Sequence, residues 1–224
     1  MLDLGCGPGS ITTGLAAAVT PDGATLGIDA APGQVARAAD TLFRSAAEAT
    51  TGAVAGAGAA LPVRTGVFDV AFAHALFEHV PDPAAMLGEL RRALRPRGLL
   101  AVCSSDWNTA TIQPRTKCVE TALQAYWRLR QRSGTDPFTG GNLPTCVQAA
   151  GFTVYSARPV DRIDMAYGDL GAYLRDRLTT ARHSGEDHSD ELADAARAAA
   201  AWAATNHPGT FIQRWVEVLA TPAG

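Results

Sequence analysis

The stretch MLDLGCGPGS, residues 1–10, decides the fold of this chain. A short apolar run carries Asp3, the glycines Gly5, Gly7 and Gly9 follow, and a helical pattern begins near Ser10. Glycines at this spacing let the backbone turn tightly and let a ligand approach closely, because no Cβ stands in the way. A helix that follows directly points its free N–H groups at that ligand. The stretch therefore predicts a strand, a ligand-binding loop and a helix.

The glycine spacing separates two kinds of nucleotide site. The dinucleotide fingerprint G-x-G-x-x-G needs a small third residue where this chain has Ser10, and its third glycine comes one residue early, at Gly9. This spacing favours a nucleoside ligand without a pyrophosphate over NAD, so an NAD-dependent reductase is the disfavoured alternative. Asp29 ends the next apolar run, where an acid can accept hydrogen bonds from both ribose hydroxyls. A purely structural glycine-rich turn is the remaining interpretation.

Strand-like and helix-like segments alternate along the first half, which predicts an α/β fold with a parallel sheet and crossover helices. There we expect strands over 1–4, 24–28, 53–55, 68–73 and 99–103, and helices over 10–19 and 33–49, with a third that starts at Pro83 behind an Asp82 N-cap. In the second half we expect helices over 119–132, 143–150, 163–182 and 191–205, strands over 152–158 and 213–220, and a polar loop over 185–190. The last strand should be the antiparallel member of the sheet.

With these features, the sequence resembles the class I S-adenosylmethionine-dependent methyltransferases. The resemblance is close over residues 1 to about 105, looser beyond, and nearest to the small-molecule branch that includes the ubiquinone and menaquinone C-methyltransferases. It implies a Rossmann-like, seven-stranded, mostly parallel sheet with helices on both faces, in one domain over 1–224 with a helical lid at about 160–210. The segments that carry it, in the family's order and spacing, are LDLGCGPG (2–9), GIDAAPGQ (27–34), LP (61–62), FDVA (68–71), FEHVPD (77–82) and LRPRGL (94–99).

The resemblance implies S-adenosylmethionine as the cofactor and assigns residues to it. Asp3 would orient the glycine loop and reach the ligand's amino group through water, and the three glycines would let the backbone approach the methionine part. Asp29 would bind the ribose hydroxyls, while Ala30 and Gln34 would line the adenine side. His74 would lie beside the ligand.

One position departs from the family. Where members often have an Asp that accepts a hydrogen bond from the adenine amino group, this chain has Ala57. Backbone groups near Ala57 and Gly58 could bind the ring instead. Loss of one charged hydrogen bond would weaken cofactor binding by ~1–3 kcal/mol.

Candidate groups for the chemistry follow the expected strands 68–73 and 99–103. A histidine at His74 or His79 could be a general base, because its ordinary pKa is near neutral; the alternative is that His79 caps a turn and His74 packs beside the ligand. Asp106, Trp107 and Asn108 should line the acceptor pocket, with Trp107 stacked on a flat acceptor. No metal-ligand pattern is present, so no metal is expected.

The implied reaction is an in-line displacement, in which the acceptor attacks the methyl carbon and alignment supplies most of the catalysis. A second hypothesis is a non-catalytic protein on the methyltransferase fold, which Ala57 and the short N-terminus both favour. Because the glycine loop begins at Gly5, we expect a chain that is N-terminally short relative to a fully competent enzyme.

Bulk properties agree with a soluble enzyme, which we expect in the cytoplasm. The 224 residues carry 19 Lys and Arg against 22 Asp and Glu, a formal charge of −3, which gives no reason to expect nucleic acid. No stretch approaches the ~20 apolar residues of a membrane helix, and no signal peptide is visible. The four cysteines show no C-x-x-C pair, which predicts free thiols, with Cys6 as a small filler of the glycine loop. The sequence leaves homodimerisation open.

Overall fold

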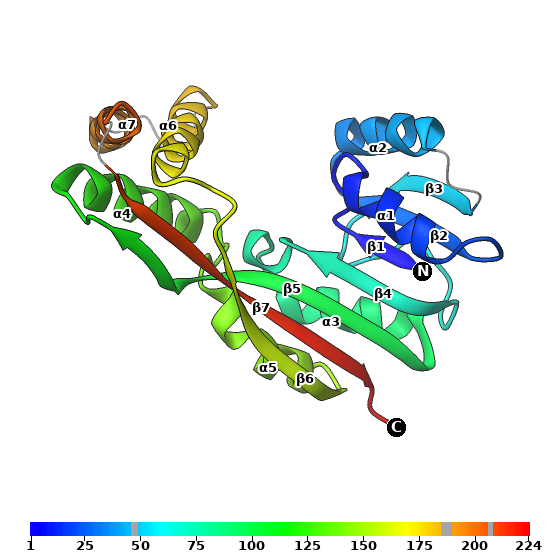
Figure 1. Cartoon of the computed structure of the whole chain (residues 1–224). Helices are drawn as coiled ribbons and strands as arrows, with labels where there is room; N and C mark the ends of the chain where they lie inside the picture. Colours follow the sequence, from blue (N-terminus) through cyan, green and yellow to red (C-terminus); the bar gives the residue numbers. More distant parts are fainter. Residues whose placement is uncertain (46–48, 185–189, 206–207) are drawn as a thin grey trace. The chain divides into compact units, whose positions relative to one another are not determined.

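The computed structural model describes residues 1–45, 49–184, 190–205 and 208–224 and contains a seven-stranded sheet. The strand order is β3-β2-β1-β4-β5-β7-β6, with β1 to β5 paired in parallel and β7 running opposite to β5 (Figure 1). The predicted α/β class and the mostly parallel sheet are confirmed. The strands are β1 (Leu2–Leu4), β2 (Ala24–Asp29), β3 (Thr50–Ala55), β4 (Phe68–His74), β5 (Leu94–Gln113), β6 (Phe152–Arg162) and β7 (Thr210–Pro222).

Seven α-helices and one 3-10 helix lie within the described ranges. They are α1 (Ser10–Ala18), α2 (Pro32–Arg44), the 3-10 helix η1 (Phe77–His79), α3 (Pro83–Ala93), α4 (Lys117–Arg132), α5 (Thr139–Ala149), α6 (Tyr167–His183) and α7 (Asp190–Ala203). None of these helices is long and apolar enough to cross a membrane.

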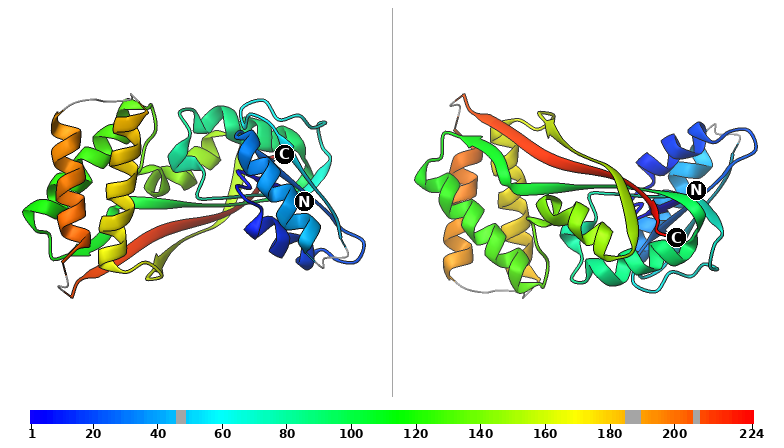
Figure 2. Two further views of the ribbon diagram at one scale, coloured as in Figure 1. Left: turned by 90° about the horizontal axis from the view of Figure 1, so that it is seen from above. Right: turned by 90° about the horizontal axis from the view of Figure 1, so that it is seen from below.

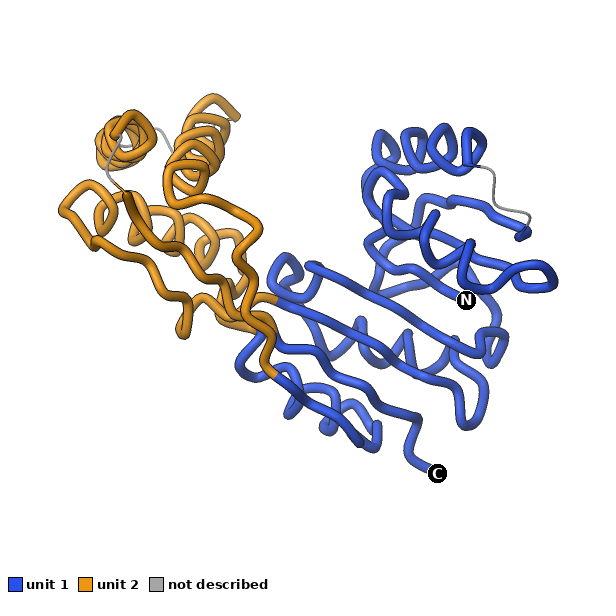
Figure 3. The backbone as a smooth tube through the Cα atoms, viewed as in Figure 1, with its two compact units in different colours: residues 1–104, 140–158, 216–224 blue, residues 105–139, 159–215 orange. Residues whose placement is uncertain are grey.

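The chain divides into two compact units, drawn in different colours in Figure 3. The first unit comprises residues 1–104, 140–158 and 216–224, and the second comprises 105–139 and 159–215. Strands β5, β6 and β7 contribute residues to both units. The second unit therefore includes 105–139 as well as the expected lid segment. The prediction of one domain with a helical lid stays a prediction.

In the first unit, the pleat of the strands separates an apolar face from a site-bearing face. Leu4 on β1 pairs with Ala73 on β4, and both are buried with Leu87 and Leu90 of α3. The intervening Asp3 points to the opposite face, where α1 lies. Figure 1 shows α1 and α2 on one side of this part of the sheet and α3 and α5 on the other.

Helix α3 starts as the sequence predicts. The Asp82 side chain accepts a hydrogen bond from the Ala85 amide at 2.9 Å, and Pro83 occupies the first helical turn.

In the second unit, α4, α6 and α7 pack together (Figures 1 and 2). Their buried faces enclose Leu123, Leu174 and Trp202, and the starting end of β7 adds Phe211. Gly171 is required on α6, because a Cβ there would lie 3.0 Å from Cγ of Trp202.

Several expected element bounds were wrong. Helix α2 ends at Arg44, because Ser45 is extended with a ψ of 142°, and the expected helix over 33–49 is too long. Strand β6 continues to Arg162, so α6 begins at Tyr167 instead of residue 163. Within the expected loop over 185–190, residues 185–189 lie outside the described residues.

Strand β5 shows the largest difference, since it begins at Leu94 and not at residue 99. Leu94 pairs with Phe68 of β4, and after a register shift Leu99 pairs with Val70. The shift accommodates Arg97, which has a φ of 67°. Pro96 and Gly98 suggest a helix stop followed by a loop, but pairing with β4 draws these residues into the strand.

Candidate functional site

The glycine loop and the end of β2 are joined by a carboxylate. The Asp29 side chain accepts a hydrogen bond from the Gly7 amide through Oδ2 and another from the Ala31 amide through Oδ1, each at 2.9 Å. The amides of Gly5 and Cys6 both donate to the Ile28 carbonyl, at 2.7 and 3.1 Å. Parallel pairing of β1 with β2 brings these groups to the same edge of the sheet, where ligands bind in open α/β folds.

The glycines of the loop serve different purposes. Gly7 has a φ of +51°, and a Cβ on it would meet nothing within 4 Å, so the loop is open to a ligand here. Gly9 has a φ of +84°, and its Cβ would lie 3.0 Å from Cα of Ala38 on α2. The third glycine thus permits close packing of the helix start against α2, while Gly5 lies against Leu76.

Beneath the loop, Asp3 is buried, with 2% of its surface exposed. It accepts a hydrogen bond from Oγ1 of Thr12 at 2.6 Å. Burial raises the pKa of Asp3, and the hydrogen bond from Thr12 opposes that rise. Burial also raises the pKa of the Cys6 thiol to about 11, helped by the negative charges of Asp3 and Asp29. Cys6 therefore fills space beside Gly27, as predicted, in a region of negative potential.

The residues expected on the adenine side follow the ends of β2 and β3, except Gln34, which lies in the first turn of α2. Ala30 and Ala57 are exposed, and Ala57 forms a tight bridge with Ala60. Gly58 lies so close to Met86 that a Cβ would be 2.3 Å from its Cε. The side-chain oxygen of Gln34 is buried and has no hydrogen-bond partner among the residues that the structure describes.

An ion pair on α3 fixes the segment that follows Gly58. The Glu89 carboxylate accepts from the Leu61 amide at 2.7 Å, and the Arg92 guanidinium donates to the carbonyls of Leu61 and Val63. The same guanidinium donates to Glu89, which lowers the pKa of that carboxyl. Sequence reasoning missed this pair, although its spacing of three on a helix was a visible signal.

The two candidate bases differ in their surroundings. His74 ends β4, half-buried, with its ring nearly parallel to that of Phe72 at a centroid distance of 6.4 Å. His79 ends η1 and is exposed, and its amide donates to the Leu76 carbonyl at 2.8 Å.

Between these histidines in the sequence lies a buried acid that sequence reasoning missed. The Glu78 carboxylate is 5% exposed and accepts a hydrogen bond from the hydroxyl of Ser104, which is fully buried at β5. The sequence signal was weak, since it shows only that Glu78 follows an apolar residue, Phe77, in the FEHVPD segment.

His74 lies in a hollow on one face of the sheet. The cavity has a volume of about 480 Å³ and is lined by residues of β4, β5, β6 and β7, among them Phe72, Cys103, Arg158 and Glu217. Because Asp3 pairs with Phe72, this is the face that carries α1. His74 therefore belongs to the wall of this cavity, a placement that the sequence did not predict.

The expected acceptor residues lie in the second unit. The Asp106 carboxylate is buried and accepts from the Asn108 amide at 3.0 Å and from Oγ1 of Thr109 at 2.9 Å. The Trp107 ring is 8% exposed and packs on Phe211 and Tyr126, so it belongs to the apolar core of that unit. Asn108 is exposed.

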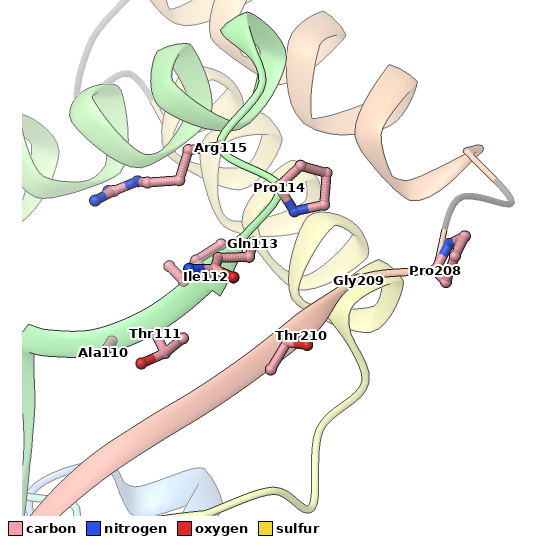
Figure 4. A pocket seen from close by; sticks show the side chains of 9 residues that line it. All are labelled: Ala110, Thr111, Ile112, Gln113, Pro114, Arg115, Pro208, Gly209 and Thr210. Atoms are coloured by element: carbon pink, nitrogen blue, oxygen red, sulfur yellow. The ribbon is translucent and has the colours of Figure 1, made fainter.

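A larger cavity of about 880 Å³ lies in the second unit, at the end of β5 and the start of β7. Thr111 and Thr210 line it from the two strands (Figure 4). Arg115 also lines it and forms an ion pair with Glu120 at 2.7 Å. None of the predicted site residues lines this cavity.

Comparison with known proteins finds similarity mainly over the first part of the chain. Residues 2–102 match the family model described as a methyltransferase domain. The chain is 34% identical over 163 residues to an uncharacterized 37.1 kDa protein in transposon TN4556 of Streptomyces fradiae, which covers 72% of this chain and 46% of that protein. It is 39% identical over 106 residues to a trans-aconitate 2-methyltransferase of Methylobacterium nodulans, covering 47% of this chain and 38% of that enzyme. The chain thus spans about half or less of the length of these relatives.

A solved structure of an S-adenosylmethionine-dependent methyltransferase from Methanosarcina mazei has the same fold. It aligns with a TM-score of 0.64 at 16% identity, over 100% of this chain and 92% of its own. At this identity the likeness shows the fold alone.

Proposed function

We propose that this chain transfers a methyl group from S-adenosylmethionine to a small-molecule acceptor. The match of residues 2–102 to the methyltransferase-domain model and the fold shared with a solved methyltransferase support this proposal. The observation that carries the proposal is the Asp29 carboxylate at the end of β2. Each of its oxygens accepts one backbone N–H, which fixes its orientation. Each oxygen retains accepting capacity, so the pair suits the two hydroxyls of a ribose.

The other groups of the glycine-loop site also fit an adenosine donor. Open space at Gly7 admits the methionine part, and the buried Gln34 oxygen can accept a hydrogen bond from a ligand. The carboxyl groups of Asp3 and Asp29 add negative charge near the loop, which suits a donor that carries a sulfonium and an ammonium group.

When bound, the donor supplies an activated methyl group and leaves as S-adenosylhomocysteine. The protein's part is to hold the acceptor in line with the methyl carbon and to exclude water. An acceptor that must lose a proton needs a base, and we assign this role to His74 or His79. We assign the acceptor side to Asp106, Trp107 and Asn108.

The acceptor would be methylated on carbon, oxygen or nitrogen, as in the small-molecule branch with the ubiquinone and menaquinone C-methyltransferases. The matched trans-aconitate 2-methyltransferase supports a small organic acceptor. This proposal also includes a role in natural-product biosynthesis and a cytoplasmic location. It further includes a homodimeric state and the absence of a nucleic-acid partner.

Ala57 supports a second candidate function, a ligand-binding protein without turnover. Its methyl side chain offers no acceptor to the adenine amino group, so the ring would depend on backbone groups near Ala57 and Gly58.

Calorimetry with S-adenosylmethionine, S-adenosylhomocysteine and NAD tests the proposal. We expect binding of the first two and none of NAD. A transfer assay with labelled donor and a panel of acceptors then separates the two candidates: binding with label transfer supports the enzyme, and binding without transfer supports the ligand-binding protein. Absence of binding of both adenosine ligands at millimolar concentration would contradict both.

A further inference from the structure

Two helices of the second unit carry the same pair of residues and face each other. Tyr126 and Arg130 lie four residues apart on α4, and Tyr173 and Arg177 lie four residues apart on α6. Residues at this spacing share one face of a helix. The packing of α4 against α6 therefore gathers two tyrosines and two arginines at one place.

The tyrosines meet through their hydroxyl groups. Their oxygens are 3.4 Å apart, and the rings are edge-on at a centroid distance of 6.2 Å. The Arg177 guanidinium lies 5.8 Å from the centroid of the Tyr173 ring. Both Arg130 and Arg177 act on the Tyr126 phenol through their charge, so the positive groups lie near the hydroxyl pair.

One side of the cluster packs against apolar side chains of the core. Tyr126 is 3% exposed, and its ring packs against Trp107 at 5.9 Å, which in turn packs on Phe211. Tyr173 is only half-buried and Arg177 is exposed, so the other side is open to solvent. The Tyr126 ring is thus held in place, and a ligand would approach the cluster from the side of Tyr173 and Arg177.

The charge of Arg177 is not balanced by a carboxylate within the described ranges. Arg128 on α4 pairs with Glu191 at 2.7 Å, and Arg175 on α6 pairs with Asp176 at 2.8 Å. Among the residues that the structure describes, Arg177 has no carboxylate partner, and its guanidinium lies over the Tyr173 ring.

The donors outnumber the acceptors in this cluster. The two tyrosine hydroxyl groups carry two hydrogens, and their mutual hydrogen bond uses one of them. The other hydroxyl hydrogen can be donated to a ligand. A guanidinium adds donors in a planar fork that matches a carboxylate. We propose that Tyr126, Tyr173 and Arg177 bind the carboxylate group of a small organic anion. The anion is either the methyl acceptor of the proposed function or a separate effector.

Calorimetry on the intact chain tests the site without any methyl donor, so the result does not depend on methyl transfer. Citrate, succinate and benzoate are the probes, and their neutral methyl esters at the same ionic strength are the controls. We expect at least one carboxylate to bind and its ester not to bind. Binding of none of the three acids, or equal binding of an acid and its ester, would overturn the proposal.

Variants locate the binding. Arg177→Gln and Tyr173→Phe should each weaken it by about tenfold or more, since each removes a charged or neutral donor. Tyr173→Phe keeps the ring that packs on Tyr126, and near-ultraviolet circular dichroism checks that the fold is retained. Arg175→Gln is the matched control on the same helix and should leave affinity unchanged. Equal losses of carboxylate affinity in Arg175→Gln and Arg177→Gln would show that the Tyr–Arg cluster is not the binding site.

Labelled S-adenosylmethionine then distinguishes the two sources of the carboxylate. Transfer of label to the bound acid identifies it as an acceptor. Binding that Arg177→Gln weakens, without transfer, identifies an effector site. Both outcomes require the Tyr–Arg cluster, so both support the proposal.

Discussion

The Gly7 amide donates a hydrogen bond to Oδ2 of Asp29 at 2.9 Å across 22 residues of sequence. The loop and the carboxylate therefore hold each other in place before any ligand binds. A site that is ordered in advance loses less conformational entropy when it binds. The proposed donor site gains its geometry from this bond and from the second bond to the Ala31 amide.

Removal of the Asp29 carboxylate should weaken donor binding. We expect Asp29→Ala to cost roughly 1–3 kcal/mol in affinity for S-adenosylmethionine, because both ribose hydroxyls lose a charged acceptor and the loop loses its bond. Calorimetry measures the change, and Asp40→Ala, at an exposed position of α2, is the matched control. Unchanged affinity in Asp29→Ala would remove this residue from the site.

Substitution of alanine for two glycines near the start of α1 should change the stability of the fold in opposite directions. Gly9→Ala should destabilise the fold by at least about 1–2 kcal/mol, because the left-handed backbone and the contact with Ala38 both disfavour a Cβ. Gly14→Ala, inside α1 with nothing within 4 Å, should stabilise it by roughly 0.5–1 kcal/mol. Urea denaturation gives both values, and a Gly9→Ala protein as stable as the parent would contradict the packing described.

The buried Asp3 should make the fold more stable as the pH falls. Burial raises its pKa in the folded state, so the unfolded chain ionises first and ionisation of Asp3 favours unfolding. This cost is absent below the unfolded pKa near 3.8 and is complete above the folded pKa. Asp3→Asn should therefore be more stable than the parent at pH 7, and the difference should shrink toward pH 4.

Denaturation of both proteins between pH 4 and pH 7 measures that difference. Asp22→Asn, at an exposed turn, controls for the loss of one negative charge. A constant difference between Asp3→Asn and the parent across this range would show that Asp3 is not the group responsible.

A histidine that acts as the base should be essential for an acceptor with an acidic proton. Replacement of that residue, His74→Asn or His79→Asn, should lower turnover by about a hundredfold while donor affinity stays within a few-fold. Steady-state rates with labelled donor, together with calorimetry, separate the two effects. Wild-type rates in both variants would mean that alignment alone drives transfer.

The sequence by itself determined the identity of the loop and the class of the fold. The glycine loop, Asp29 and the Asp82 cap are local patterns, because spacing along a few residues fixes a turn, an N-cap or a strand end. The alternation of apolar runs with helical segments was enough to predict the parallel sheet. These features depend on neighbours in the chain, so one sequence suffices to find them.

Only the tertiary structure decided what the polar side chains meet. Strand β5 extends through Pro96 and Gly98 because β4 pairs with it. The hydroxyl contact of Tyr126 with Tyr173 joins residues 47 apart, and Ser104 meets Glu78 across 26. Trp107 was expected to stack on an acceptor, and the tertiary structure also packs its ring against Tyr126 and Phe211. Such contacts depend on register and helix packing, which bring distant residues together and leave no periodic signal in the chain.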